Sequence, residues 1–464
     1  MTEPETQRDN PLALPVEQMR ELAHLVADLV VDHLEELREL PALRKETPEH
    51  LFSVLAGPLP EQPGDPAADL RLLADEALTA MQYANHPRYF ARVPGPASFP
   101  GVLGDWLGIG FQAMASSWVG GAGPVAAELT AMGWMAEMIG LPAHTQGVVM
   151  SGGSMANLTA LLAARAELGE GQVYLSDQTH SSIRRGLEVC GFHPEQLVTV
   201  DTGVALRLGV PEVRAAVEAD IAAGRRPTMV VATAGATNTG AVDDIAGLRE
   251  LCDEHGMWLH VDGAYGGPGA MTERGRAQTG DLSRVDSLVI DPHKWLFQPY
   301  DAGCVFVTRP GVLERTYTMN PEYLVDVTST GGEVDLRNRS LELSRRARGL
   351  KLWLTIRTYG AEKLRRAIDC GIENAELAES MLREDSFWEV VTPAQLGVVT
   401  FAAVGIEEDA HRAAADSLTD SGWATLTTTT LNGRLVLRLC LINPGTTEAD
   451  IRGTLQRLRA LLEG

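Results

Sequence analysis

The sequence predicts an α/β protein in which a large domain with a mostly parallel sheet lies between an N-terminal helical arm and a small C-terminal α+β domain. The main observation is that, from about Gly101, short β-branched apolar runs alternate with helical patterns, as in parallel strands joined by crossover helices. The second observation is length, because 464 residues exceed what one ordinary core accommodates. We place the arm at residues 1–98, the large domain at 99–358 and the small domain at 359–464.

The arm begins with an amphipathic pattern. Apolar residues recur at three- and four-residue steps between Val16 and Leu34, which predicts a helix whose apolar stripe packs on a partner surface. Residues 55–66 are rich in proline and glycine and predict a linker or a wrapped loop. We therefore expect this segment to dock on another surface.

Seven apolar runs predict the strands of the large domain, at residues 147–150, 173–176, 197–200, 229–233, 258–262, 287–290 and 304–307. In the small domain a long helical pattern extends to Leu382 and is followed by alternating segments at 397–404 and 434–441. The capping-box pattern Thr-Glu-Ala-Asp at 447–450 predicts the start of a closing helix.

Composition excludes several classes of protein. The 39 basic and 62 acidic residues give a net charge of −23, which disfavours binding to nucleic acid and to anionic lipid. No run of about 18 apolar residues predicts a membrane span, and the polar, acidic start of the chain does not resemble a signal peptide. The five cysteines are an odd number without metal-ligand spacing, so we expect them to be reduced and no metal to be bound. These observations predict a cytoplasmic protein that acts on a small molecule.

In open parallel sheets, ligands bind beyond the carboxyl ends of the strands, so the residues that follow each apolar run are candidates for function. After the run at 147–150, Ser151-Gly152-Gly153-Ser154 leads into a helical pattern. Glycines let backbone N–H groups approach an anion, and a helix N-terminus carries partial positive charge. The turn predicts a phosphate cup, although a strand-turn-helix with two glycines is equally expected for structural reasons alone.

Lys294 gives the strongest local signal. The chain has four lysines against 35 arginines, and Lys294 stands between His293 and Trp295, directly after the buried run at 287–290. A lysine in that place is poorly suited to be a solvated surface charge. Burial beside another cation lowers the pKa of a lysine and favours the neutral amine, so we expect Lys294 to hold pyridoxal 5'-phosphate as a Schiff base.

Three further residues follow strands. Asp262 ends the buried run at 258–262, where a carboxylate needs a cation or a hydrogen-bond donor; it either pairs with the protonated pyridine nitrogen of the cofactor or caps the next helix. His180 follows the run at 173–176 and either stacks on the cofactor ring and transfers protons or bonds to the start of a helix. Thr237, in a turn rich in hydroxyls and glycine, either reaches the cofactor or substrate or shapes the turn.

In this order, the glycine cup, His180, the Gly-Ala-Thr turn at 235–237, Asp-Gly-Ala-Tyr at 262–265 and Pro-His-Lys-Trp at 292–295 resemble the group II pyridoxal-phosphate decarboxylases. That family includes aromatic-amino-acid, histidine, glutamate and cysteine-sulfinate decarboxylases, and the likeness covers most of the chain. It implies the pyridoxal-phosphate fold type I, which is aspartate-aminotransferase-like, and a homodimer with shared active sites. It also implies pyridoxal 5'-phosphate as the cofactor and an amino acid as the substrate.

The resemblance implies a role for each residue around the cofactor ring. Lys294 would form the Schiff base, and Asp262 would pair with the pyridine nitrogen. His180 would stack over the ring, and Ala264 would pack under it. Thr237 would lie near the cofactor and the reacting carboxylate.

The same resemblance assigns the phosphate to a second group of residues. Gly153, Ser154 and His293 would surround it, with Gly152 completing the cup. Asp291 stands where an asparagine is more usual near the phosphate.

Residues 320–324 (Asn-Pro-Glu-Tyr-Leu) resemble the family's mobile loop, and the residues after them have a flexible, polar composition. In that family the loop tyrosine, here Tyr323, protonates the α-carbon after carbon dioxide leaves, whereas relatives with phenylalanine there oxidise the substrate to an aldehyde. Tyr323, with His180, Lys294 and Asp262 as the other catalytic residues, therefore predicts α-decarboxylation of an L-amino acid to the amine. Aldehyde formation or transamination is the alternative, and these intact residues disfavour a non-catalytic binding module.

Four residues concern the substrate: Arg92, Val93, Met114 and Ser116. The pair Arg92-Val93 stands where aromatic-amino-acid decarboxylases carry an aromatic pair, and the segment from Met114 to Ser116 lacks the aromatic residue expected there. The resemblance therefore leaves the substrate open between an aromatic amino acid and an acidic or other one. Arg92 either pairs with an acidic or polar substrate side chain or lies in a surface salt bridge.

Overall fold

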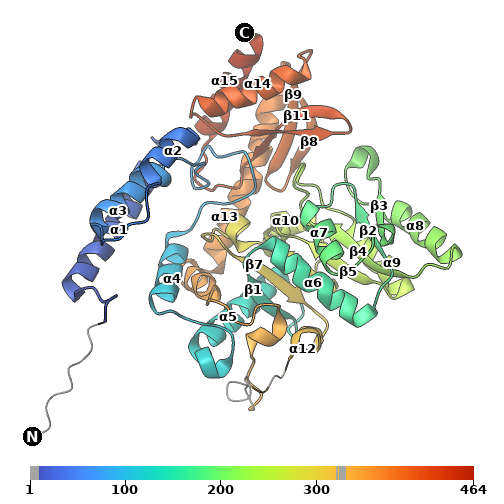
Figure 1. Ribbon diagram of the computed structural model, residues 1–464. Coiled ribbons are helices and arrows are strands. Elements are labelled where there is room, and N and C mark those ends of the chain that lie inside the picture. Colours follow the sequence, from blue (N-terminus) through green and yellow to red (C-terminus); the bar gives the residue numbers. More distant parts are fainter. Residues whose placement is uncertain (1–9, 320–321, 323–330) are drawn as a thin grey trace, which may run out of the picture.

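The computed structural model describes residues 10–319, 322 and 331–464, in which Figure 1 shows three regions. A group of N-terminal helices lies along one side of the body. The largest region is built on a seven-stranded sheet, and the C-terminal region is built on a four-stranded sheet. The predicted α/β class, with a mostly parallel sheet and a smaller α+β region, is confirmed.

The large sheet has the strand order β1-β7-β6-β5-β4-β2-β3. Its strands are β1 (Gln146–Met150), β2 (Gln172–Ser176), β3 (Leu197–Val200), β4 (Pro227–Thr233), β5 (Trp258–Asp262), β6 (Ser287–Ile290) and β7 (Gly303–Val307). Each strand ends at the residue predicted from its apolar run. Only β7 is antiparallel to its neighbours, β1 and β6, so the carboxyl ends of the other six strands face one edge of the sheet.

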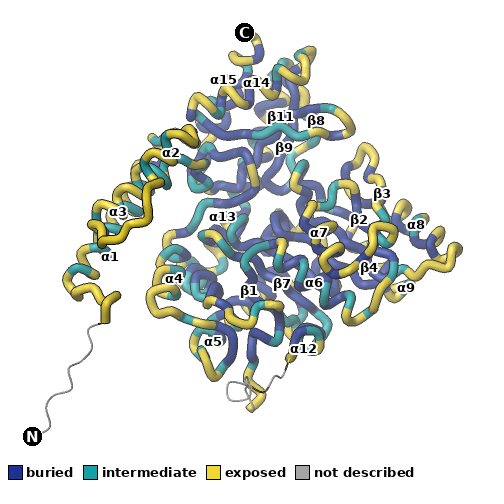
Figure 2. Tube along the Cα trace, in the orientation of Figure 1, coloured by how far each residue is buried: buried dark blue, intermediate teal, exposed yellow. Residues whose placement is uncertain are grey.

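Helices cover both faces of this sheet, which explains why every residue of β2, β5, β6 and β7 is buried. Figure 2 shows the buried strands beneath helices whose outer sides are exposed. The helices of this region are α4 (Phe99–Gly110), α5 (Trp118–Ile139), α6 (Gly153–Leu168), α7 (Ser181–Val189), α8 (Val210–Ala222), α9 (Ile245–His255), α10 (Glu273–Thr279), α11 (Pro292–Trp295) and α12 (Val312–Tyr317).

The N-terminal region contains α1 (Val16–Glu36), α2 (Pro48–Leu55) and α3 (Pro66–Leu72), and α1 begins where the apolar pattern begins. None of these three helices contains a buried residue, and Figure 2 shows them largely exposed beside the body. No helix in the described part of the chain combines the length and the apolar character needed to cross a membrane.

The helix α13 (Gly349–Glu384) turns at Gly360 and leads into the C-terminal region, and the domain boundary at 358/359 stays a prediction. Gly360 has φ of 71°, a left-handed conformation that favours glycine. The antiparallel sheet has the order β10-β11-β9-β8, built from β8 (Trp388–Gln395), β9 (Val398–Ala403), β10 (Thr427–Leu431) and β11 (Arg434–Cys440). It packs with α14 (Glu408–Asp420) and α15 (Glu448–Glu463), and α15 starts with the predicted capping box.

A fully buried ion pair fixes the end of β1. Glu128 on α5 lies 2.8 Å from Arg345, and both side chains have 0% exposure. Glu128 Oε1 accepts a hydrogen bond from the Val149 N–H at 3.0 Å, and Arg345 donates to the carbonyl oxygens of Val149 and Ala115. The pair therefore joins β1 to the segments before α5 and before α13.

We expect Arg345→Met to lower the free energy of unfolding by about 3–5 kcal/mol, because it leaves the Glu128 carboxylate buried without its cation. The control is Arg434→Met, which removes an exposed ion pair with Glu389 and should cost less than about 1 kcal/mol. Urea unfolding at neutral pH measures both. Equal losses in the two variants would contradict the role given to the buried pair.

Candidate active site

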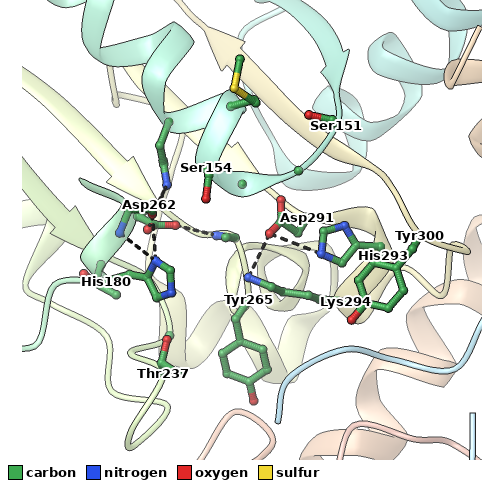
Figure 3. A pocket seen from close by; sticks show the side chains of 18 of the residues that line it. Ser151, Ser154, His180, Thr237, Asp262, Tyr265, Asp291, His293, Lys294 and Tyr300 are labelled. Atoms are coloured by element: carbon green, nitrogen blue, oxygen red, sulfur yellow. Dashed lines mark hydrogen bonds and ion pairs between the residues drawn. The ribbon is translucent and has the colours of Figure 1, made fainter. Parts of the chain in front are cut away.

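A cavity of about 380 Å³ lies at the carboxyl ends of the parallel strands. All ten predicted cofactor-binding residues line it: Gly152, Gly153, Ser154, His180, Thr237, Asp262, Ala264, Asp291, His293 and Lys294. They come from turns after β1, β2, β4, β5 and β6, which the parallel topology brings to the same edge of the sheet. Figure 3 labels the side chains of Ser154, His180, Thr237, Asp262, Asp291, His293 and Lys294 around the cavity.

The turn between β1 and α6 forms one end of the cavity. Gly152 has φ of 155°, and α6 begins at Gly153. A Cβ atom at Gly153 would lie 2.6 Å from Asp291 Oδ2, so this position has no room for a larger residue. With the backbone N–H groups of the first turn of α6 and the hydroxyl of Ser154, this end can bind an anion.

Asp262 lies at the end of β5, where it is buried and accepts two hydrogen bonds. Asn157 Nδ2 donates to Oδ2 at 3.2 Å, and the N–H of Ala264 donates to Oδ1 at 3.1 Å. Neither donor is charged, and within the described residues Asp262 makes no ion pair. A protonated pyridine nitrogen is the kind of partner that this carboxylate lacks.

A chain of hydrogen bonds continues from Asn157 into the sheet. Asn157 Oδ1 lies 3.0 Å from His260 Nε2, His260 Nδ1 lies 2.8 Å from Ser287 Oγ, and Trp258 Nε1 donates to Ser287 Oγ at 2.8 Å. Because Asn157 donates to Asp262 through Nδ2, its Oδ1 accepts from His260 Nε2, and His260 Nδ1 accepts from Ser287. One neutral tautomer of His260 satisfies the whole chain. Burial lowers the pKa of His260 to about 4, against the opposing charge of Asp262.

His180 is the N-cap residue of α7, as the helix-start alternative predicts, and its role at the cofactor ring stays a prediction. Its Nδ1 accepts from the Ser182 N–H at 3.2 Å, and the imidazole also lines the cavity. Ser182 Oγ lies 2.8 Å from His180 Nδ1 and 3.4 Å from Asn157 Nδ2. Asn157 therefore links the segment that carries His180 to the carboxylate of Asp262.

The charge environment of Lys294 differs from the prediction. Its Nζ lies 2.9 Å from Asp291 Oδ2. Burial lowers the pKa of Lys294, but the ion pair and hydrogen bond with Asp291 and the charge of Asp262 outweigh it, so the pKa lies above its ordinary value. Burial also lowers the pKa of His293, so this residue is not the neighbouring cation that was expected. The predicted lowering of the lysine pKa is wrong, because the dominant neighbour is an acid.

Several cavity residues were not identified from the sequence, among them Asn157, Gln178, Tyr265 and Tyr300. Asn157 follows Ser154 by three residues, a spacing that places both on one face of a helix, so the signal was present. Tyr300 packs against His293 with ring centroids 4.8 Å apart. It reaches the cavity by way of the segment between α11 and β7, which no local pattern indicates.

The four substrate candidates do not line this cavity within one chain. Val93 is buried in the hydrophobic core, and its contact with the substrate stays a prediction. Ser116 is buried, and its Oγ accepts from the Arg345 N–H at 3.1 Å. Met114 lines a separate surface cavity. Arg92 is exposed, and its charge acts on Tyr300 at the cavity.

Tyr323, the predicted proton donor, lies outside the residues that the structure describes. The remaining catalytic candidates, Lys294, His180 and Asp262, share the cavity. These residues fit pyridoxal phosphate, because donors for a phosphate, the Asp262 carboxylate without a cation and the Lys294 amine line one cavity (Figure 3). The cavity volume of about 380 Å³ is also in the range of small-ligand sites.

Comparison with known proteins agrees with this geometry. Residues 60–404 match the model of the pyridoxal-dependent decarboxylase conserved domain. The chain is 40% identical, over 97% of both chains, to an aromatic-L-amino-acid decarboxylase of Bacillus atrophaeus. It is 30% identical to a phenylacetaldehyde synthase of Arabidopsis thaliana, covering 94% of both chains.

Solved structures are similar in fold along the whole chain. The Catharanthus roseus tryptophan decarboxylase in complex with L-tryptophan matches with a TM-score of 0.90 and 29% identity, covering 98% of this chain and 99% of the other. Oryza sativa TDC with PLP and tryptamine matches with a TM-score of 0.91 and 28% identity, with the same coverage. These similarities confirm the predicted fold type I and pyridoxal phosphate as the cofactor.

We expect the free energy of unfolding to fall as the pH is lowered from about 6.5 to about 4, because the unfolded chain binds a proton at His260 that the folded chain excludes. At about 1.4 kcal/mol per pH unit, this residue accounts for a loss on the order of 3 kcal/mol. His260→Gln should flatten that part of the curve, whereas His144→Gln, at an exposed position, should not. Urea unfolding from pH 4 to 7 measures the slopes, and an unchanged slope in His260→Gln would contradict the assignment.

Proposed function

The chain belongs to the pyridoxal-dependent decarboxylase family, and we propose that its substrate is an aromatic L-amino acid. Membership makes it a pyridoxal-phosphate-dependent carboxy-lyase, which converts an L-amino acid to the amine and carbon dioxide. The observation that supports an aromatic substrate is the 40% sequence identity to an aromatic-L-amino-acid decarboxylase, which extends over 97% of the chain.

We propose that the cavity residues hold the cofactor in the positions that their chemistry favours. When bound, pyridoxal phosphate supplies a protonated ring that accepts electrons from the bond to the departing carboxylate. The Lys294 amine attaches the cofactor, and the Asp262 carboxylate keeps the pyridine nitrogen protonated. The cup at Gly153 and Ser154, with His293, binds the phosphate. Each of these groups lines the cavity.

We propose that His180 and Tyr323 carry out the proton transfer of the reaction. When the bond between the α-carbon and the carboxylate breaks, a proton must replace carbon dioxide on the α-carbon. Tyr323 donates that proton through its hydroxyl, and His180 assists from the N-terminus of α7. Ala264 would pack under the ring, and Thr237 would lie beside the reacting carboxylate.

An acidic amino acid is the second candidate substrate, because of Arg92. This side chain is exposed, makes no ion pair with any residue that the structure describes, and acts electrostatically on Tyr300 at the cavity. A carboxylate on the substrate would give Arg92 a charged partner. The pair Arg92-Val93 also stands where an aromatic pair was expected, and the segment before Trp118 lacks the expected aromatic residue, which favours a more polar substrate.

We further propose that the protein is a homodimer in the cytoplasm. Large apolar side chains are exposed along α1 to α4, including Met19, Phe52, Trp106 and Leu107. An apolar surface of this extent is typical of an interface, and a second copy covers it in the proposed dimer. The five cysteines are free, which is usual in a reducing compartment; recovery of the protein from a secreted fraction would contradict this location.

We expect Lys294→Ala to lose both carbon dioxide release and the visible absorbance of the attached cofactor, since no other amine lines the cavity within the described residues. Lys363→Ala, at an exposed lysine, is the matched control and should keep both. Normal turnover by Lys294→Ala would refute the scheme.

The substrate follows from carbon dioxide release by the purified holoenzyme with the twenty amino acids and common non-protein ones. Highest turnover with an aromatic amino acid supports the first proposal, and highest turnover with an acidic one replaces it with the second. The products are identified in the same reactions. Amine supports the role of Tyr323, whereas aldehyde with peroxide contradicts it.

For the dimer, we expect sedimentation to give twice the mass of one chain. Leu107→Glu on α4, where the side chain is 57% exposed, should shift the protein to the mass of one chain and reduce activity. Val404→Glu, also at 57% exposure but in the C-terminal region, should leave the mass unchanged. A wild-type protein that sediments as a single chain would exclude the dimer.

A further inference from the structure

The carboxylate of Asp291 lies in the phosphate cup itself. Asp291 is 2% exposed, and the 2.6 Å separation between its Oδ2 and a Cβ built on Gly153 shows that the carboxylate packs against the cup backbone. Its other oxygen, Oδ1, is buried and has no hydrogen-bond partner among the residues described. Figure 3 shows Asp291 between the glycine turn and Lys294. An acid in this place is unexpected, because the cup otherwise presents groups that attract anions.

Lys294 is the cation that balances Asp291, at 2.9 Å between Nζ and Oδ2. His293 Nε2 lies 3.7 Å from Oδ2, but burial lowers the pKa of this histidine and favours its neutral form. The other titratable groups that interact with Asp291 are Tyr300 and, on β7, Cys304. On the side of α6, the first turn contributes Ser154 and no charged side chain.

Cofactor binding changes this balance. A phosphate ester brings about 1.5–2 negative charges at pH 7 into the cup that already holds the Asp291 carboxylate. At the same time Lys294 is used to attach the cofactor, so it no longer serves Asp291 as a free ammonium group. Two anionic groups that share a buried site repel each other strongly unless one of them takes up a proton.

We propose that the cup binds the phosphate together with one proton from solvent, which Asp291 and the phosphate share in a hydrogen bond. Asp291 thereby selects the phosphate monoanion over the dianion, which an asparagine at this position would not do. The proton belongs to the pair rather than to either group alone. Oδ1, which has no partner in the described residues, is the oxygen available for this bond. The inference rests on the proposed assignment of Lys294 and the cup to the cofactor.

The test is titration of the full-length apoenzyme with pyridoxal 5'-phosphate between pH 6 and 8, comparing wild type with Asp291→Asn. We expect the ratio of the wild-type dissociation constant to that of Asp291→Asn to rise by up to about tenfold per pH unit, because only the wild type requires the extra proton. Calorimetry in two buffers with different ionisation enthalpies should show that the wild type takes up about one more proton than the variant. Equal proton uptake by wild type and Asp291→Asn would overturn the proposal. This is the result expected if His293 takes up the proton in both proteins.

Two controls test whether the effect requires the phosphate group and whether it requires the carboxylate at position 291. Pyridoxal lacks the phosphate, so the ratio of its dissociation constants for wild type and Asp291→Asn should not change with pH. If this ratio changes with pH as it does for pyridoxal 5'-phosphate, the proposal is overturned. Asp301→Asn makes the same change on a nearby carboxylate that pairs with Arg348 and does not line the cavity, so it should behave as wild type.

The failure of this inference is distinguishable from failure of the proposed function. If Lys294→Ala binds pyridoxal 5'-phosphate with the same absorbance change as wild type, the assignment of the site is wrong and the inference falls with it. If that variant loses the absorbance change but wild type and Asp291→Asn have the same pH dependence, only the proton at Asp291 is refuted.

Discussion

The hydrogen bond from Asn157 to Asp262 holds the two ends of the site at a fixed separation. Asn157 lies one helical turn beyond Ser154 on α6, so the helix that starts the phosphate cup also orients the carboxylate at the opposite end. The chain of bonds through His260 anchors Asn157 in the sheet. The helix α6 and the buried strand β5 thus define the length of the cavity, and the surrounding turns contribute the reactive side chains.

Much of the frame was predictable because it depends on local patterns. Buried parallel strands produce uninterrupted apolar runs, so all seven strand ends and Asp262 at the end of β5 were placed correctly. An apolar run carries no direction, however, and the antiparallel orientation of β7 could not be read from it. The roles of Asn157 and His260 could not be predicted from local patterns either. They depend on a contact between α6 and β5, and the two residues are 103 positions apart in the sequence.

The wrong prediction for the charge environment of Lys294 has a physical cause. The residues next to a position in the sequence do not show in which direction their side chains point. Lys294 was assigned a cationic neighbour because His293 precedes it, yet the group that reaches its amine is Asp291, three residues earlier on the same helical turn. Val93 lies in the hydrophobic core of one chain, and its contact with the substrate stays a prediction.

The exposed helices of the N-terminal region have a consequence for how the protein is assembled. A helix such as α1 gains most of its stability from packing its apolar face, and within one chain α1 buries no residue fully. In the proposed dimer the second chain would supply that packing, and the arm would become stable as the subunits associate. Protein concentration would then control the folding of the first part of the chain by mass action, and dilution would loosen the arm before it affected the sheet that carries the site.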